Sequence, residues 1–388
     1  MNNFEFYSPT YFVFGKSTEE ETGKYVKRFG GSKVLLHFGG GSVVRSGLLD
    51  RVKKSLDAEG IGYIELGGVK PNPRDGLVYE GIDICKKEGI DFVLAVGGGS
   101  VMDSAKAIAA GAVYDGDFWD FFLGKSIEKA LPIGTVVTIA ATGSEGSPDT
   151  IITKEEGMLK RAADGDAVRP TFSILNPELT MTLPAYQTAC GITDIMSHVM
   201  ERYFTRTKDV EITDRMGEGI LLTMIKEAKR VMADPENYEA RANIMWAGMV
   251  AHNNTVGVGR NQDWGTHHLE HELSALYDCA HGAGLAIMFP AWMKYVMKED
   301  VMRFAQFAVR VWGCEMNFQD PEVTALEGIK AFEEFVKSIG MPTRLGEIGG
   351  KEEDISTLVK NMFYQKPNHG DFVKLTEESS AEIYKLAL

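Results

Sequence analysis

Residues 263–284, with the sequence DWGTHHLEHELSALYDCAHGAG, hold four of the eight histidines of the chain. His267 and His271 are four residues apart, so they share one face of the helix that we predict over residues 264–276. His281 stands in the sequence HGAG, where glycines let a helix end and let the backbone approach another group closely. The segment therefore predicts several imidazoles at one place in a helical region.

A second pair with the same spacing lies upstream, in the sequence DIMSH, where Asp194 and His198 are four residues apart. One carboxylate and several imidazoles form a ligand set that suits zinc or iron(II). Histidine pairs with this spacing also arise by chance and then are simply solvated or hydrogen-bonded. From the residues alone, both interpretations remain open.

Composition limits the class of protein. The 388 residues are 44% hydrophobic and 25% charged, which is typical of a globular chain with two or three domains. A net charge of -14 argues against nucleic acid or an anionic membrane surface as the main partner. The four cysteines form no CxxC motif, and the sequence shows no signal peptide and no membrane-spanning apolar run, so we expect a cytoplasmic protein.

Strand and helix patterns alternate in the first half, which predicts a parallel sheet wrapped by helices. The predicted strands are residues 33–38, 62–66, 91–96, 136–140 and 172–175, with helices over 48–58, 75–88 and 101–111. Residues 4–14 alternate and are rich in aromatics, which predicts a hairpin at a sheet edge.

Helical patterns dominate from about residue 184 onward. We predict helices over residues 187–205, 211–233, 238–253, 264–276, 285–297, 301–312, 324–338, 355–362 and 380–388. The sequence therefore predicts an α/β domain over residues 1–180 and a helical domain over residues 181–388.

Glycine-rich loops follow two of the predicted strands. Gly97, Gly98, Gly99 and Ser100 stand between a strand and a helix, where bare backbone N–H groups favour a diphosphate, and Asp103 follows in the first helical turn. Gly39, Gly40, Gly41 and Ser42 lie where dinucleotide folds place the adenosine ribose. No acidic residue is present in that loop, which favours NADP(H) over NAD(H). Thr138, Thr142 and Ser144 add hydroxyls after the next strand, and each loop could also be an ordinary tight turn or cap.

Together these motifs resemble the iron-containing, or group III, alcohol dehydrogenase family over nearly the full length. The similar segments are GGGSVMDSAK at 97–106, TGSE at 142–145, Asp194 with His198, and the histidine-rich stretch. The sequence DWGTH at 263–267 and the loop at 39–42 are similar to the branch of NADPH-dependent butanol dehydrogenases and broad-range aldehyde reductases.

The resemblance implies a Rossmann-like dinucleotide-binding domain with a parallel sheet, followed by an all-helical metal-binding domain, as in dehydroquinate synthase-like folds. It implies Fe²⁺ or Zn²⁺ bound by Asp194, His198, His267 and His281, with His271 beside the metal and near the nicotinamide but not bound to the metal. His271 is our candidate for a proton relay or an orienting group. Asn72, Thr138, Thr142 and Lys160 match positions that contact the coenzyme. His268 receives no role, and His37, His252 and His369 are expected to be ordinary polar positions.

The implied activity is NADP(H)-linked interconversion of short- to medium-chain primary alcohols, such as butanol, and aldehydes, in a protein expected to be a homodimer. Two alternatives stay open. A glycerol-dehydrogenase-like polyol oxidoreductase or a dehydroquinate-synthase-like lyase would use a similar fold, and assays with butanal and NADPH against glycerol and NAD separate these from the first activity. A non-enzymatic metal- or nucleotide-binding protein would bind the coenzyme without turnover.

Overall fold

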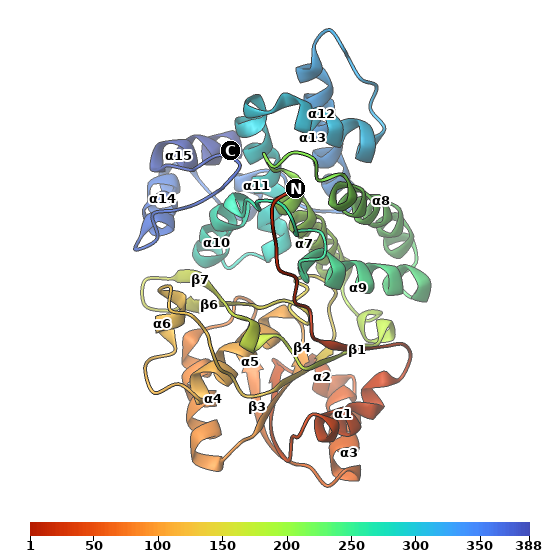
Figure 1. Cartoon of the computed structure of the whole chain (residues 1–388), viewed down its shortest axis with the longest axis vertical. Coiled ribbons are helices and arrows are strands. Elements are labelled where there is room, and N and C mark those ends of the chain that lie inside the picture. Colours follow the sequence, from red (N-terminus) through yellow and green to blue (C-terminus); the bar gives the residue numbers. More distant parts are fainter. The chain divides into compact units, whose positions relative to one another are not determined.

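The computed structural model describes residues 1–388 and divides into two compact units (Figure 1). One unit is Tyr7–Leu183, and the other is Pro184–Leu388 together with Met1–Phe6. The predicted division after residue 180 did not separate the first six residues from the α/β half. They belong with the helical unit because the Met1 amino group donates to the Lys208 carbonyl (3.1 Å) and the Asn2 N–H to the Gly259 carbonyl (2.8 Å).

The α/β unit is built on a six-stranded parallel sheet with the strand order β1-β8-β5-β4-β2-β3. The strands are β1 (Tyr11–Phe14), β2 (Lys33–Gly39), β3 (Gly62–Val69), β4 (Phe92–Gly97), β5 (Ile133–Val137) and β8 (Phe172–Leu175). The helices are α1 (Thr22–Arg28), α2 (Ser42–Arg45), α3 (Leu48–Ala58), α4 (Asp75–Glu88), α5 (Gly99–Ala112) and α6 (Trp119–Phe122). The parallel sheet predicted from the alternating pattern is confirmed.

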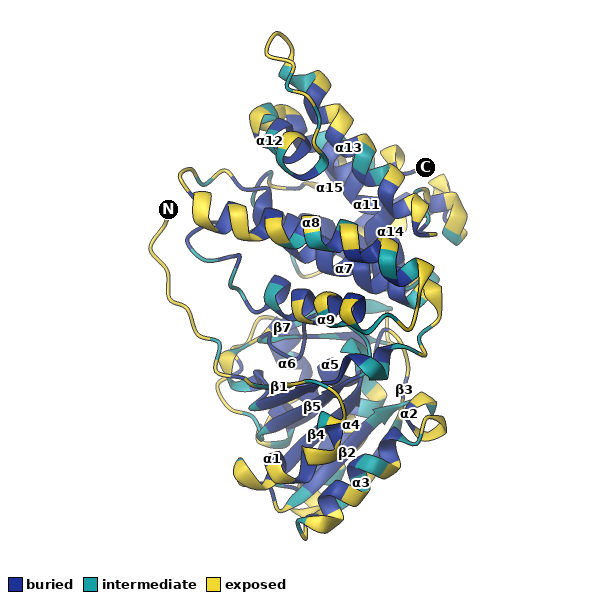
Figure 2. Cartoon of the chain, turned by 90° about the vertical axis from the view of Figure 1, so that its right-hand side faces the viewer, coloured by how far each residue is buried: buried dark blue, intermediate teal, exposed yellow.

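Side chains on alternate positions of the central strands enter different layers. Val34 and Leu36 of β2 belong to one buried cluster with residues of α1 and α3, such as Tyr25 and Leu49. His37 points to the other face, where its ring contacts Ser104 of α5. Figure 2 shows the central strands in the colour of buried residues. Burial on both faces explains why these strands read as continuous apolar runs.

Two local expectations in this unit were wrong. Residues 4–14 do not form a hairpin, because only Tyr11–Phe14 is a strand and it pairs in parallel with β8. An antiparallel pair, β6 (Asp149–Lys154) and β7 (Leu159–Asp164), was not predicted. The strand ends in Lys154 and the turn begins with Glu155 and Glu156, and that charge makes the region resemble a loop.

The other unit is helical apart from its connections. Its helices are α7 (Ala185–Tyr203), α8 (Glu211–Ala233), α9 (Tyr238–His252), α10 (Gly265–Tyr277), α11 (His281–Val296), α12 (Val301–Trp312), α13 (Pro321–Ser338), α14 (Ile355–Phe363) and α15 (Glu377–Leu386). Helix α11 is buried almost throughout and packs against α7, α10, α13 and α15. None of the helices combines the length with the apolar character that crossing a bilayer requires.

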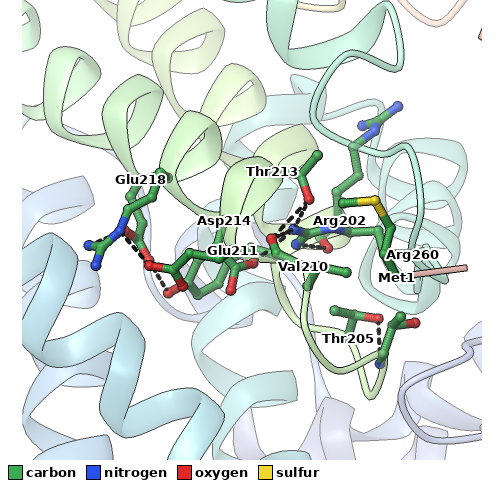
Figure 3. Close-up of polar contacts among 12 residues, drawn as sticks. Met1, Arg202, Thr205, Val210, Glu211, Thr213, Asp214, Glu218 and Arg260 are labelled. Carbon is green, nitrogen blue, oxygen red and sulfur yellow. Dashed lines mark hydrogen bonds and ion pairs between the residues drawn. The ribbon is translucent and has the colours of Figure 1, made fainter.

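A buried ion-pair network fastens the segment before α10 to α7 and α8 (Figure 3). The Arg260 guanidinium pairs with Asp214 at 2.8 Å and donates to the carbonyls of Arg202 (3.0 Å) and Val210 (3.1 Å). Arg303 of α12 pairs with the same Asp214 carboxylate. Removing one member of such a buried pair costs several kcal/mol, so the network anchors the segment that precedes α10.

His37 makes the stability of the α/β unit depend on pH. Its side chain is fully buried, with Nδ1 donating to the Leu66 carbonyl (2.9 Å) and Nε2 accepting from the Ser104 hydroxyl (2.8 Å). Burial lowers the pKa of His37 to about 4. An unfolded histidine binds a proton near its ordinary pKa of about 6.5, so the unfolded state gains protons first as pH falls.

We therefore predict that His37 removes about 2 kcal/mol of unfolding free energy between pH 7 and pH 5. The contribution is present above the unfolded pKa and is lost as pH falls toward the folded pKa. Urea unfolding at both pH values measures it, and His37→Gln should show a pH dependence smaller by that amount. An identical pH dependence in the variant and the unsubstituted protein would contradict the prediction.

Candidate metal centre and coenzyme loops

Three helices of the helical unit bring the predicted metal ligands together. Helix α7 carries Asp194 and His198, α10 carries His267, and α11 begins with His281. Oxygen and nitrogen donors of Asp194, His267 and His281 all lie within 4.8 Å of one another. A single ion could contact all three after small side-chain adjustments.

His198 lies at the edge of this group. Its Nε2 is 3.6 Å from Oδ1 of Asp194, and its ring centroid is 5.0 Å from that of His267. Its Nδ1 is buried without a hydrogen-bond partner. Burial, followed by the neighbouring His252 and His267, lowers the pKa of His198 well below its ordinary value, so the ring is held neutral, as a metal ligand must be.

Two carboxylates that the sequence analysis did not single out stand behind the histidines. Nδ1 of His267 donates to Oε1 of Glu201 at 2.7 Å, and Nδ1 of His281 donates to Glu270. Each contact leaves Nε2 as the lone-pair nitrogen of its ring, which is how carboxylates orient metal-binding histidines. Their spacing does not identify these pairs, because Glu201 lies three residues after His198 but contacts His267, and Glu270 lies three residues after His267 but contacts His281.

The charge of the cluster favours a cation. The carboxylates of Asp194, Glu201 and Glu270 are almost fully buried, and buried carboxylates are costly unless a positive charge balances them. Burial raises the pKa of Glu201 to about 8, and the N–H groups of His267 and Trp264 offset only part of that rise, so a cation beside this carboxyl would favour its ionised form. The donor set and its charge therefore fit a divalent metal.

The glycines of HGAG permit the approach of α11 to its neighbours. A Cβ on Gly282 would lie 2.1 Å from the Cys190 carbonyl oxygen of α7, and one on Gly284 would lie 2.5 Å from a Glu270 oxygen of α10. We expected a helix to end at His281, but α10 ends at Tyr277 and α11 starts at His281. The glycines thus serve close helix packing, which places His281 beside Asp194 at 3.7 Å.

Of the remaining histidines, His271 and His252 lie beside predicted metal ligands, whereas His268 faces His369. His271 is buried, with its ring centroid 5.7 Å from that of His281, and its donor atoms group with those of Glu270 and His281. His252, expected to be an ordinary polar position, has its ring 4.0 Å from that of His198. His268 instead faces His369, at 4.7 Å.

The predicted coenzyme residues follow neighbouring strands of the sheet in the α/β unit. Because β5, β4, β2 and β3 are adjacent and parallel, the loops after them lie along one edge. These segments contain Gly39–Ser42 at the end of β2, Asn72 after β3, Gly97–Ser100 at the end of β4, and Thr138 and Thr142 after β5. A Cβ on Gly99 would lie 2.4 Å from the Thr142 side chain, so two of the loops are in contact.

Lys160 of β7 reaches this edge as well. Its ammonium group donates to Oδ1 of Asn72 at 3.1 Å, and both side chains are buried. Asn72 has a left-handed backbone with φ of 52°, as the turn after β3 requires. The structure thus brings together two residues that are 88 positions apart in the chain.

Asp103, Lys106 and Ser144 are engaged with protein groups. The Ser144 hydroxyl donates to the Asp103 carboxylate at 2.7 Å, and Nζ of Lys106 donates to the carbonyls of Ser147 (2.9 Å) and Asp149 (2.8 Å). Burial raises the pKa of Asp103 to about 6 and lowers the pKa of Lys106 to about 8. These contacts hold the segment after Thr142 against helix α5.

Comparison with known proteins assigns the family. A model of the iron-containing alcohol dehydrogenases matches residues 9–177, and one of the C-terminal region of the Fe-containing alcohol dehydrogenase family matches residues 188–388. The chain belongs to the iron-containing alcohol dehydrogenase family. The two matches fall within the α/β unit and the helical unit, respectively.

Relatives within this family cover the whole chain. The probable NADH-dependent butanol dehydrogenase 2 of Bacillus subtilis is 44% identical over the full length of both chains. The NADPH-dependent aldehyde reductase YqhD of Escherichia coli is 37% identical, again over both full lengths. The crystal structure of NADH-dependent butanol dehydrogenase A from Thermotoga maritima matches with a TM-score of 0.97 at 44% identity, covering 100% of this chain and 99% of the other.

The buried Lys106 contacts generate a stability prediction. Lys106→Met would remove the donor from two carbonyls and leave Asp103 buried without its nearest cation, so we expect the unfolding free energy to fall by about 3 kcal/mol. Lys53→Met is the matched control, because Lys53 also lies on a helix of this unit but pairs with Glu65 at the surface. That variant should lose less than about 1 kcal/mol in urea unfolding. Equal losses in the two variants would contradict the prediction.

Proposed function

We propose that this protein interconverts short- to medium-chain primary alcohols, such as butanol, and the corresponding aldehydes, with NADP(H) preferred as the coenzyme. Membership of the family establishes the coarser activity, that of an NAD(P)-dependent oxidoreductase acting on alcohols and aldehydes. The single observation that supports metal-dependent chemistry at this site is the group of Asp194, His267 and the partly exposed His281, whose donor atoms lie within 4.8 Å of one another.

We assign Asp194, His198, His267 and His281 as the ligands of one divalent iron or zinc ion. Neutral imidazoles and one carboxylate are donors that both metals accept. When bound, the ion supplies the Lewis acidity that polarises a carbonyl oxygen or lowers the pKa of an alcohol. The residues of the chain hold that position, because Glu201 and Glu270 fix two of the imidazole rings from behind.

His271 is our candidate for the group that holds or moves a proton near the substrate. It lies one helical turn from His267 and its ring is close to that of His281, yet it stands outside the assigned ligand set. A histidine that does not bind the metal keeps its ring nitrogens available for proton transfer. The donor atoms of His271 also group with those of Glu270 and His281, so metal analysis of a His271 variant separates the two roles.

The coenzyme preference rests on the loop after β2. Gly39, Gly40, Gly41 and Ser42 offer N–H and O–H donors and no carboxylate to repel a 2′-phosphate, and Arg45 is exposed close by. Relatives in this family carry both coenzyme names: NADH for the butanol dehydrogenases and NADPH for YqhD. The loop chemistry of this chain supports NADPH, and direct kinetics decide the preference.

The ligand assignment predicts two distinct classes of variant. Asp194→Ala and His267→Ala should lose the metal, and turnover of butanal with NADPH should fall about a thousandfold or more. His271→Ala should keep the metal while turnover falls about a hundredfold, as for loss of a proton-transfer group. Metal analysis of protein purified without oxygen, together with steady-state kinetics, measures both. Loss of metal from His271→Ala would make His271 a ligand, and full metal content in the other two variants would refute the assignment.

The coenzyme proposal predicts a lower KM for NADPH than for NADH. Gly40→Asp should raise the KM for NADPH about tenfold, because a new carboxylate would repel the 2′-phosphate. A Cβ at Gly40 meets no atom within 4 Å, so the substitution has room. Gly40→Asn is the neutral control of equal size and should leave the NADPH/NADH ratio close to that of the unsubstituted protein. Equal KM values for the two coenzymes before any substitution would dispose of the preference.

A further inference from the structure

Two carboxylates outside the assigned ligand set stand behind the candidate metal centre. We infer that Glu201 and Glu270 are positioning residues that set the affinity of the centre for its metal, acting through His267 and His281; this rests on the metal assignment of the proposed function. Both carboxylates are almost fully buried, and each accepts a hydrogen bond from Nδ1 of a different histidine. The two histidines come from different helices, so the centre contains two separate carboxylate–histidine pairs.

Glu201 orients His267 by holding the start of its helix. Its Oε1 accepts from both the backbone N–H (2.9 Å) and Nδ1 (2.7 Å) of His267, and its Oε2 accepts from the Trp264 N–H (2.8 Å). A side chain of α7 therefore caps the N-terminus of α10, where N–H groups lack partners within the helix. The same carboxylate fixes the backbone and the ring of His267 relative to α7, which also carries Asp194.

Glu270 contacts only the ring of His281, whereas Glu201 also contacts the backbone of His267. One of its oxygens faces Nδ1 of His281, and the Ser274 hydroxyl donates to the other. Gly284 of α11 leaves no space on the remaining side, since a Cβ there would lie 2.5 Å from a Glu270 oxygen. The carboxylate is thus held from two sides, and the His281 ring is held by it.

His198 provides an internal contrast. Its Nδ1 is buried and has no hydrogen-bond partner, so no carboxylate supports this third imidazole. An anionic acceptor at Nδ1 fixes the tautomer and makes Nε2 a stronger donor to a metal. The two supported histidines should therefore contribute most of the affinity, with the charges of Glu201 and Glu270 adding to that of Asp194.

The test is metal affinity measured on the full chain, with no reference to turnover. Glu270→Gln retains an oxygen that can accept from His281 but removes the charge. We expect its affinity for Zn²⁺, measured by competition with a chelator, to be about 10–100-fold weaker. Ser274→Ala should show a smaller loss in the same direction. In Co²⁺-loaded protein, the visible absorption of Glu270→Gln should shift as well, a signature that a purely structural role for Glu270 would not produce.

Glu218→Gln is the matched control. Glu218 is a buried carboxylate of the same unit, but it faces Tyr203 and Arg310 and no histidine. Its Zn²⁺ affinity should stay within about twofold of the unsubstituted protein. Glu270→Gln with unchanged affinity and unchanged Co²⁺ spectrum would overturn the inference, as would equal losses in Glu270→Gln and Glu218→Gln.

Failure of the metal assignment itself has a different outcome. Unsubstituted protein that binds neither Zn²⁺ nor Co²⁺ would refute both the proposed metal centre and the inference built on it. Tight binding by the unsubstituted protein with no loss in Glu270→Gln refutes only the role of the outer carboxylate. If Glu270→Gln does not fold, Ser274→Ala decides through the same measurements: a weaker Zn²⁺ affinity supports the inference, and an unchanged one overturns it.

Discussion

Buried negative charge is the constraint on which the helical unit depends. Asp194, Glu201 and Glu270 are removed from water beside imidazoles that burial keeps neutral in at least one case, that of His198. Three carboxylates in so small a volume repel one another unless a cation is present. By burying these carboxylates, the packing of α7, α10 and α11 favours binding of a divalent ion. The donor atoms of the candidate ligands favour it as well.

The α/β unit depends on a different constraint, the parallel order of its strands. Parallel pairing places every loop that follows a strand at the same edge, and the central order β5-β4-β2-β3 brings four of them into sequence. Buried contacts from α5 then hold the segment after Thr142 in place.

Periodicity in the sequence predicted most elements, since an amphipathic helix or a buried strand repeats its pattern over many residues. Helices α8 and α12 have the bounds expected from the sequence. The pair β6 and β7 was missed because its strands are short and its turn is charged. Glu201 and Glu270 were missed for another reason: each contacts a histidine on a different helix, 66 positions away for Glu201 and 11 for Glu270, so the pairing is recognisable only once those helices are packed together.

Substitutions at the start of α11 would disturb the candidate metal centre even though they change none of its candidate ligands. Even a methyl group on Gly282 would meet the backbone of α7, and one on Gly284 would meet Glu270. The helix would have to slide outward, and His281 would move with it. The absence of side-chain atoms at these two positions therefore sets how closely His281 can approach Asp194.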